Sequence, residues 1–201
     1  MINTVAILET VSYFISSKIT NHRLMVELEH ASRHDALTGL HNRNACMEKI
    51  DFLTKYSSSV GIVYADVNGL KEINDTLGHQ AGDAALRQAA RLLTKCYGLE
   101  NTYRIGGDEF LVLVPLVTEL DFKTSVCRLR ELVAGKADLS IAIGSEWVAD
   151  TAHLERVITK TDQRMYCDKV EYYNRRGKKR ETRHDLNDFR RMAAKSLSIA
   201  D

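Results

Sequence analysis

Residues 104–110 place two adjacent glycines before two adjacent acids, in the order Arg-Ile-Gly-Gly-Asp-Glu-Phe. Two glycines in a row permit the positive φ angles of a tight turn, and the flanking residues predict strands over 102–105 and 109–114. The chain is therefore expected to form a β-hairpin whose tip carries Asp108 and Glu109. Carboxylates on a rigid tip suit Mg²⁺ and phosphate chemistry, whereas the alternative is a surface hairpin with ordinary solvated acids.

A second acid stands at the end of an apolar segment. Residues 59–67 form an apolar run that is too short for a helix, which predicts a strand covered on both faces. Asp66 lies near its end, where α/β folds bind their ligands. If the two strands are neighbours, Asp66 and Asp108 can share a cation, and Mg²⁺ is commonly held by one or two carboxylates plus substrate phosphates. This pattern favours a polymerase-like or cyclase-like nucleotide site over a closed structural metal site.

The composition indicates a cytoplasmic protein with one core domain and an appendage. Of the 201 residues, 44% are hydrophobic and 27% are charged, which supports a sizeable core and a solvated surface. A net charge of +1 gives no argument for a nucleic-acid or membrane partner, and no apolar run approaches the ~20 residues that span a bilayer. The cysteines are far apart, without the spacing of a metal site or a disulfide framework, and are expected to be reduced thiols: Cys46, Cys96, Cys127 and Cys167.

The first 33 residues predict a long amphipathic helix that contains neither Gly nor Pro. Its apolar residues recur mainly at spacings of three and four: Leu8, Val11, Ile15, Ile19, Leu24, Leu28 and Ala31. Thirty helical residues extend about 45 Å, which is too long to pack wholly on a small domain. The apolar seam could pair with a second copy in a parallel coiled coil, although Lys18 and His22 weaken its middle. The alternative is a helix that folds back on its own domain.

The remaining sequence predicts an α+β fold of ferredoxin-like, palm-type plan, with an antiparallel sheet and flanking helices. Strand, helix, hairpin, helix and strand follow one another in the order of that plan, with the helices expected on one side of the sheet. The expected elements are helix 44–56, strand 59–67, helix 80–97, the hairpin, helix 119–134, strand 138–145 and helix 151–171. We expect three parts: a signalling helix (1–33), a core domain (34–175) and a basic, partly helical tail (176–201).

Four ordered blocks of this chain resemble the GGDEF family of diguanylate cyclases. The family signature stands as Gly-Gly-Asp-Glu-Phe at 106–110, and Asp-Ala-Leu-Thr-Gly-Leu-His-Asn-Arg at 35–43 resembles its entry motif. Residues 66–83 resemble its metal and guanine segment, and 139–144 resemble a later core strand. The resemblance covers about residues 33–175. It implies a palm-like fold and the condensation of two GTP into cyclic di-GMP and two pyrophosphates.

The resemblance implies a metal site and catalytic groups at the matching positions. Asp66, Asp108 and the backbone carbonyl of Val67 match the family's ligands for Mg²⁺, with Mn²⁺ as a second metal that could serve. Asp108 would also accept the proton of the attacking hydroxyl, with Glu109 in support. The alternative for Glu109 is a hairpin acid that only adds to the negative electrostatic potential of the site. Lys71 matches a lysine that stabilises charge on the phosphates in the transition state, and its alternative is a solvent-facing lysine.

The resemblance also implies the residues that bind the phosphates of GTP. The backbone amides of Gly69 and Leu70 match amides that face phosphates, and Lys169 matches a lysine that holds the terminal phosphates. The family has an arginine four residues later, where this chain has Tyr173. A tyrosine offers one neutral donor in place of a charged fork, so we expect weaker GTP binding. Either arginine at 175–176 could substitute, although a solvated basic run is the favoured role of that segment.

Asn74 and Asp83 match the pair that reads guanine in this family. Guanine offers a ring N–H and an exocyclic amine along one edge, and a carboxylate accepts from both. Adenine lacks this donor pair and would leave Asp83 buried without a partner. His79 lies between the two in sequence and either shapes the pocket or caps the turn.

The implied reaction needs two domains, because each contributes one nucleotide. We therefore expect a homodimer formed through the N-terminal helix and through facing active sites. Residues 8–19 resemble the last helix of a GAF-type sensor module, which implies an upstream sensor domain. The window 97–100 lacks the family's inhibitory RxxD motif, so product inhibition is expected to be absent. The alternatives are a catalytically weak or silent GTP-binding signalling module, favoured by Tyr173, and an interaction protein that acts through its helix and basic tail alone.

Overall fold

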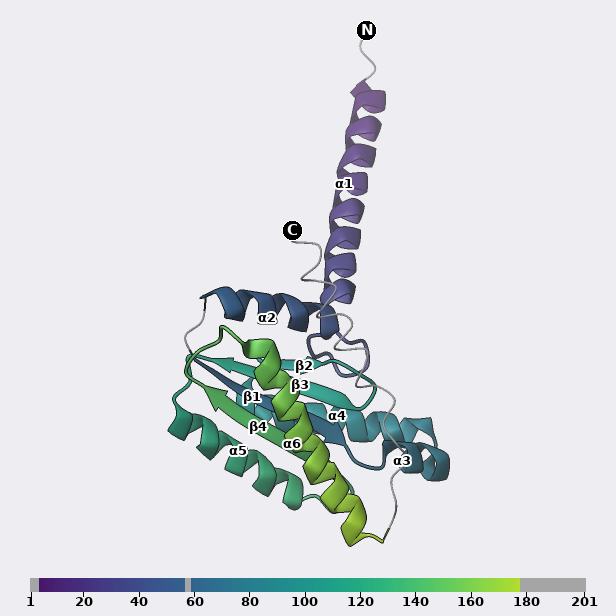
Figure 1. Ribbon diagram of the computed structural model, residues 1–201. Coiled ribbons are helices and arrows are strands. Elements are labelled where there is room, and N and C mark those ends of the chain that lie inside the picture. Colours follow the sequence, from purple (N-terminus) through teal and green to yellow (C-terminus); the bar gives the residue numbers. More distant parts are fainter. Residues whose placement is uncertain (1–3, 57–58, 178–201) are drawn as a thin grey trace.

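The computed structural model describes residues 4–56 and 59–177 (Figure 1). In chain order, the elements within these ranges are α1 (Thr4–Arg33), α2 (Arg43–Tyr56), β1 (Val60–Val67), α3 (Leu70–Leu77), α4 (His79–Tyr97), β2 (Thr102–Arg104), β3 (Glu109–Pro115), α5 (Glu119–Ala134), β4 (Ile141–Val148) and α6 (Leu154–Arg175). The α+β class and the antiparallel sheet are those that the sequence predicts. The expected helical character of the tail falls on residues outside the described ranges.

The four strands form one antiparallel sheet in the order β2-β3-β1-β4. The Gly-Gly hairpin joins β2 to β3, as predicted, and β3 lies beside β1. Every residue of β1 is buried, as the uninterrupted apolar run predicts for a central strand. The register pairs Asp66 with Glu109, so the end of β1 meets the hairpin tip.

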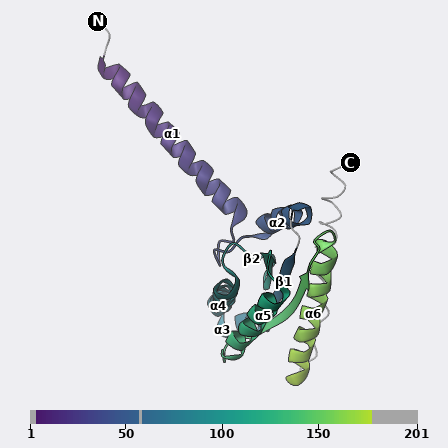
Figure 2. The same cartoon turned by 90° about the vertical axis from the view of Figure 1, so that its left-hand side faces the viewer.

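Helices cover both faces of this sheet (Figure 2). The two helices of the ferredoxin-like plan, α4 and α5, lie together on one face as expected, whereas α2 and α6 cover the other face. Val63 and Phe110 belong to a core cluster with α4 and α5, whereas Ile62 and Leu111 belong to a second cluster with α2 and α6. The cause is the apolar character of successive residues along β1 and β3. Side chains alternate between the two faces of a strand, so such a run creates a hydrophobic layer on each face that must be covered.

Helix α3 was not anticipated from the sequence, which predicted one helix beginning at residue 80. In the structure α3 and α4 are separate helices that meet at Gly78, whose φ of 84° interrupts the helical backbone. Helix α3 buries none of its eight residues fully, and an apolar pattern over only two turns is too short to identify a helix from sequence. The strand predicted over 138–145 is β4, shifted three residues towards the C-terminus, and the last helix extends to Arg175.

Helix α6 approaches the sheet very closely at Gly144 of β4. A Cβ atom at this position would lie 2.1 Å from the Thr161 carbonyl oxygen and 2.5 Å from the Met165 amide nitrogen. Backbone atoms cannot move aside as a side chain can, so glycine is required for this contact. The contact fixes α6 against β4 one turn before Lys169, and it thereby directs Lys169 towards the end of β1.

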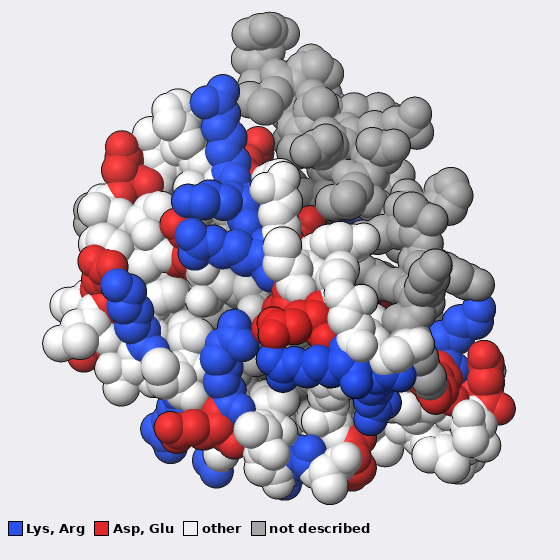
Figure 3. Space-filling model, turned by 60° about the horizontal axis from the view of Figure 1, so that its bottom comes forward, with Lys and Arg blue, Asp and Glu red and all other residues white. Residues whose placement is uncertain are grey.

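Side chains cover the outer edge of β4. The Ile143 amide donates to Oδ2 of Asp168 at 2.8 Å, and the Ile143 carbonyl accepts from Nη2 of Arg130 at 2.8 Å. The Ser145 carbonyl accepts from Nη1 of Arg164 at 2.9 Å. Figure 3 shows the lower end of the molecule, where Lys and Arg side chains lie directly beside Asp and Glu side chains. At the opposite edge of the sheet, the carbonyl of His41 accepts from the Arg104 amide at 2.8 Å.

Helix α1 projects away from the domain in both views (Figures 1 and 2), so the alternative of a helix folded back on the domain does not hold. Val11, Ile15, Ile19 and Leu24 of the predicted seam are each about half or more exposed, at 47%, 50%, 64% and 51%. The side chains of the remaining seam residues lie outside the described part. Pairing of this seam with a second copy stays a prediction. Among the described residues, no helix combines the length and the apolar character that crossing a membrane requires.

Candidate active site

Asp66 and the hairpin tip meet at one end of the sheet, as the sequence predicts. Asp66 is 2% exposed near the end of β1, and the Val67 amide donates to the Asp108 carbonyl at 3.1 Å. In a strand the amide and carbonyl of one residue point to the same side. The Val67 carbonyl therefore also faces the loop that carries Asp108, so all three predicted metal-binding residues lie around one point.

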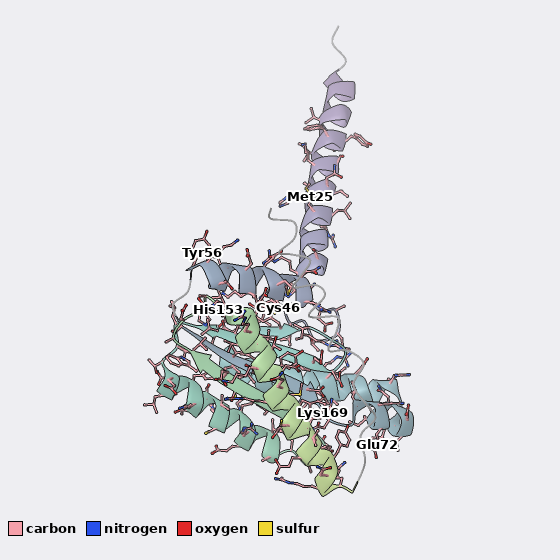
Figure 4. The ribbon with its side chains drawn as sticks, viewed as in Figure 1. Met25, Cys46, Tyr56, Glu72, His153 and Lys169 are labelled. Atoms are coloured by element: carbon pink, nitrogen blue, oxygen red, sulfur yellow. The ribbon has the colours of Figure 1, made fainter. Side chains whose placement is uncertain are left out.

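The ammonium group of Lys169 lies between the two carboxylates. It donates a hydrogen bond to Oδ1 of Asp66 and lies 3.6 Å from Oδ2 of Asp108. Lys169 is only 5% exposed, and Figure 4 shows it on α6, with Glu72 of α3 at the same end of the sheet. A buried positive charge at this point shows that the two acids form a place for a cation.

The electrostatics of Asp66 reflect this burial. The pKa of Asp66 is raised to about 7: burial is the largest cause, the Asp108 carboxylate adds to it, and the Lys169 ammonium offsets only part of both effects. A carboxyl group that resists ionisation in the metal-free protein gains the most from a divalent cation, because added positive charge favours the ionised form.

The backbone amide of Gly69 has a side-chain partner that the sequence did not anticipate. It donates to the hydroxyl oxygen of Tyr173 at 3.1 Å, and Gly69 has a φ of 71°, in the left-handed region that favours glycine. Tyr173 follows Lys169 by one helical turn, so α6 presents both side chains to the same end of the sheet. The tyrosine at the position of the expected arginine thus occupies the amide that was predicted to face a phosphate.

The predicted base-reading residues lie on neighbouring helices. Asn74 belongs to α3 and is half-buried, and Asp83 belongs to α4, where its nearest ion-pair partner is Arg87 at 3.9 Å. His79 begins α4 and is exposed, and Lys71 is exposed on α3. Because both side chains are exposed, the predicted roles stay predictions: phosphate stabilisation or a solvent-facing position for Lys71, and shaping the pocket or capping the turn for His79.

One ion pair that the sequence did not predict ties the hairpin tip to the segment after α1. Nη1 of Arg104 lies 2.9 Å from Oδ1 of Asp35, and Nη2 of Arg104 donates to the Gly107 carbonyl at 2.8 Å. Burial alone would raise the pKa of Asp35, but hydrogen bonds from Thr38 and Arg104 hold it below its usual value. Both residues belong to motifs visible in the sequence, but nothing in either motif indicated that they touch.

The donor set at this site fits a divalent cation that shares its coordination with a substrate. Among the described residues, no group of three or more His, Cys, Asp and Glu side chains could hold a metal ion by itself. Two carboxylates and a backbone carbonyl supply part of an oxygen shell, and Mg²⁺ ordinarily completes such a shell with water and phosphate oxygens.

Comparison with known families matches residues 32–175 to the family described as "Diguanylate cyclase, GGDEF domain". The chain belongs to the GGDEF family. The match begins at the end of α1 and ends at the end of α6, so it takes in every element of this GGDEF domain.

Two relatives illustrate the breadth of the similarity. The chain is 30% identical over 168 residues to diguanylate cyclase DgcM of Escherichia coli, with 76% of this chain and 40% of that protein covered. It is 36% identical over 98 residues to cyclic di-GMP phosphodiesterase PdeR of the same organism, with 47% of this chain and 15% of that protein covered. The chain thus spans less than half the length of these curated relatives.

A solved structure shares the fold and the helix that precedes it. The coiled coil and GGDEF domain of DgcB from Caulobacter crescentus, in complex with c-di-GMP, superposes with a TM-score of 0.71 at 20% identity. The superposition covers 85% of this chain and 96% of that one.

Proposed function

We propose that this GGDEF domain is a diguanylate cyclase, which condenses two GTP into cyclic di-GMP and two pyrophosphates. The observation that carries the proposal is the meeting of Asp66 and Asp108 around one cation position, beside the amide of Gly69. Family membership and the similarity to diguanylate cyclase DgcM support a role in the synthesis of cyclic di-GMP.

In this proposal Asp66, Asp108 and the Val67 carbonyl hold Mg²⁺ or Mn²⁺. When bound, the metal neutralises part of the triphosphate charge and makes the attacking 3′-hydroxyl more acidic. The position of the Lys169 ammonium between the two carboxylates supports this role, because the pair already accepts a positive charge.

The chain's own residues bind the triphosphate and move the proton. The amides of Gly69 and Leu70 donate to phosphate oxygens, which requires the Tyr173 hydroxyl to leave the Gly69 amide. Lys169, released from Asp66, pairs with the terminal phosphates, and Lys71 is proposed to stabilise charge from the other side. These contacts hold the α-phosphorus at a fixed place relative to the hairpin tip.

Bond making and breaking occur between two domains. The 3′-hydroxyl of the nucleotide on one domain attacks the α-phosphorus of the nucleotide on the other, and pyrophosphate leaves. The hydroxyl proton passes to Asp108, with Glu109 beside it in support. The same exchange in the opposite sense closes the ring, so two GTP yield one cyclic di-GMP and two pyrophosphates.

Base recognition is assigned to Asn74 and Asp83, with His79 at the rim of the pocket. The Asp83 carboxylate has only a distant partner in Arg87, at 3.9 Å, and its side chain is 45% exposed. It can therefore accept from the ring N–H and the amine of guanine at little cost. Adenine offers no such pair of donors, so GTP is preferred over ATP.

The exposed helix α1 is proposed to bring two domains together. Its described apolar side chains are too exposed for a helix that functions alone in water, and a second copy of the same face would cover them. Linking two sites in this way raises their effective concentration relative to each other. Deletion of residues 1–32 should reduce both dimerisation and turnover, and unchanged values of both would contradict this role. The sensor domain upstream of α1 stays a prediction.

A specific observation favours a second candidate, a weak or silent GTP-binding module that acts through dimerisation. Two side chains of α6, Lys169 and Tyr173, fill the cation position and one phosphate amide. The similarity to a phosphodiesterase over 98 residues also shows that the fold occurs in proteins named for another activity.

One assay separates the two candidates. The protein is incubated with GTP and Mg²⁺ or Mn²⁺, and cyclic di-GMP and pyrophosphate are quantified by chromatography. A cyclase gives both products in a ratio of one to two, and Asp108→Ala abolishes them while GTP binding is retained. If a dimeric, GTP-saturated sample forms no product, the binding module is favoured. Asp51→Ala, on the exposed outer face of α2, is a matched control that should behave as the wild type.

A further inference from the structure

Gly82 of α4 lies directly against the side chain of Asn74 on α3. A Cβ atom at position 82 would lie 1.9 Å from Oδ1 of Asn74 and 2.9 Å from its Cγ. Both distances are far below van der Waals contact, so the observed orientation of the Asn74 amide is compatible only with glycine at position 82. The amide oxygen rests where every other amino acid carries its side chain.

The helix itself does not require glycine at this position. Gly69 and Gly78 have positive φ angles, but Gly82 has helical geometry within α4. Alanine is a better helix former than glycine, so glycine here lowers the intrinsic stability of α4. The next nearest atom to the added Cβ is Cδ1 of Leu70 at 3.3 Å, which a small side-chain shift can relieve. The requirement for glycine therefore comes from Asn74.

The Asn74 amide is held in place but is not used within the protein. Its backbone carbonyl accepts from the Gly78 amide at 2.9 Å, which closes the end of α3. Its side-chain amide makes no hydrogen bond to the part of the chain that the structure describes. A half-buried amide without a partner is costly unless a ligand or water satisfies it. Asp83 follows Gly82 directly, so the amide and the carboxylate flank the same junction between the two helices.

We propose that Gly82 is a positioning residue for base recognition, because its missing side chain holds the Asn74 amide in the orientation that meets the nucleotide. The identity of the ligand as a guanine nucleotide rests on the proposed function, whereas the contact between Gly82 and Asn74 does not. Any side chain at position 82 turns the amide away and leaves Asp83 to bind the base alone.

The test is a double-mutant cycle of Gly82→Ala and Asn74→Ala, read by calorimetric binding of a non-hydrolysable GTP analogue. Loss of one hydrogen-bonding group to the base weakens binding about tenfold. We expect this loss for each single variant and less than a twofold further loss when Gly82→Ala is added to Asn74→Ala. In steady-state assays the loss appears in KM, with kcat unchanged. Wild-type affinity in Gly82→Ala, or losses that multiply in the double variant, would overturn the proposal.

A second measurement does not depend on nucleotide. In ¹⁵N-labelled protein the Asn74 side-chain amide signals should shift in Gly82→Ala, and unchanged signals would refute the contact. Gly135→Ala is the matched control, because a Cβ there lies at least 3.5 Å from its neighbours. If Gly82→Ala fails to fold, the double variant must fold, since the clash is then gone; a double variant that also fails overturns the proposal. If the wild type binds no GTP analogue, the proposed function fails while the amide signals still decide the role of Gly82.

Discussion

The metal-free protein should lose stability as the pH rises from 5 to 8, because Asp66 ionises within the fold in that range. In the unfolded chain this carboxyl ionises near pH 3.8, whereas burial raises its pKa in the fold to about 7. The folded state therefore holds the proton more tightly, and folding is favoured at low pH and disfavoured as the pH passes through 7.

The size of this effect follows from the two pKa values. The difference between 3.8 and about 7 corresponds to about 4 kcal/mol of lost stability once both states are ionised. Roughly 2.5 kcal/mol of this loss falls between pH 5 and pH 8. It can be measured by urea unfolding in the presence of a chelator, followed by the fluorescence of the single tryptophan, Trp147. A double variant, Asp66→Asn with Lys169→Met, removes both charges of the buried pair and serves as the reference.

Two outcomes would refute this reasoning. If the wild type and the double variant lose stability in parallel between pH 5 and pH 8, Asp66 does not titrate as its burial requires. If Mg²⁺ or Mn²⁺ raises Tm by the same amount at pH 5 and at pH 8, the cation does not act on the Asp66 carboxylate. We expect a larger rise at pH 8, because a bound cation removes the cost of ionising that group.

Two further variants test the placement of α6. Gly144→Ala should destabilise the protein by about 2–4 kcal/mol, because its Cβ would lie 2.1 Å from the Thr161 carbonyl oxygen and 2.5 Å from the Met165 amide nitrogen. A lower urea midpoint of unfolding would measure this loss, and a variant as stable as the wild type would contradict the close contact. Tyr173→Phe should lower KM for GTP about two- to tenfold, because phosphate then no longer competes with the hydroxyl for the Gly69 amide. A higher KM would show instead that the hydroxyl donates to the bound substrate.

The hairpin and the meeting of Asp66 with Asp108 were predictable because they depend on local signals. The two glycines fix the turn, and the apolar run before Asp66 can only be a central strand. Adjacent antiparallel strands then bring the two acids together. The contact of Tyr173 with Gly69 was not predictable in this way. It joins residues 104 positions apart and depends on how closely α6 crosses β4 at Gly144, which no local pattern encodes.

The missed helix α3 shows a different limit of sequence analysis. It spans only eight residues and buries none of them fully, and two turns are too few for an apolar pattern to identify a helix. The resemblance nevertheless assigns its Asn74 a part in base recognition, which stays a prediction, whereas the proposed role of Gly82 in holding that side chain had no counterpart in the sequence analysis. A glycine with helical φ angles marks no turn that a sequence pattern could reveal. Its importance here is the missing Cβ atom, whose effect depends on which side chain lies beside it in the fold.

The covered edges of the sheet bear on how two copies of this protein can meet. Exposed edge strands attract further strands and lead to aggregation or to continuous intermolecular sheets. Here Asp168, Arg130 and Arg164 bond three backbone groups of β4, at Ile143 and Ser145, and His41 lies against the edge of β2. These contacts oppose extension of the sheet by a strand of a second copy. Two domains are left free to approach and separate through their other surfaces, as the proposed encounters between two GTP-loaded sites would require.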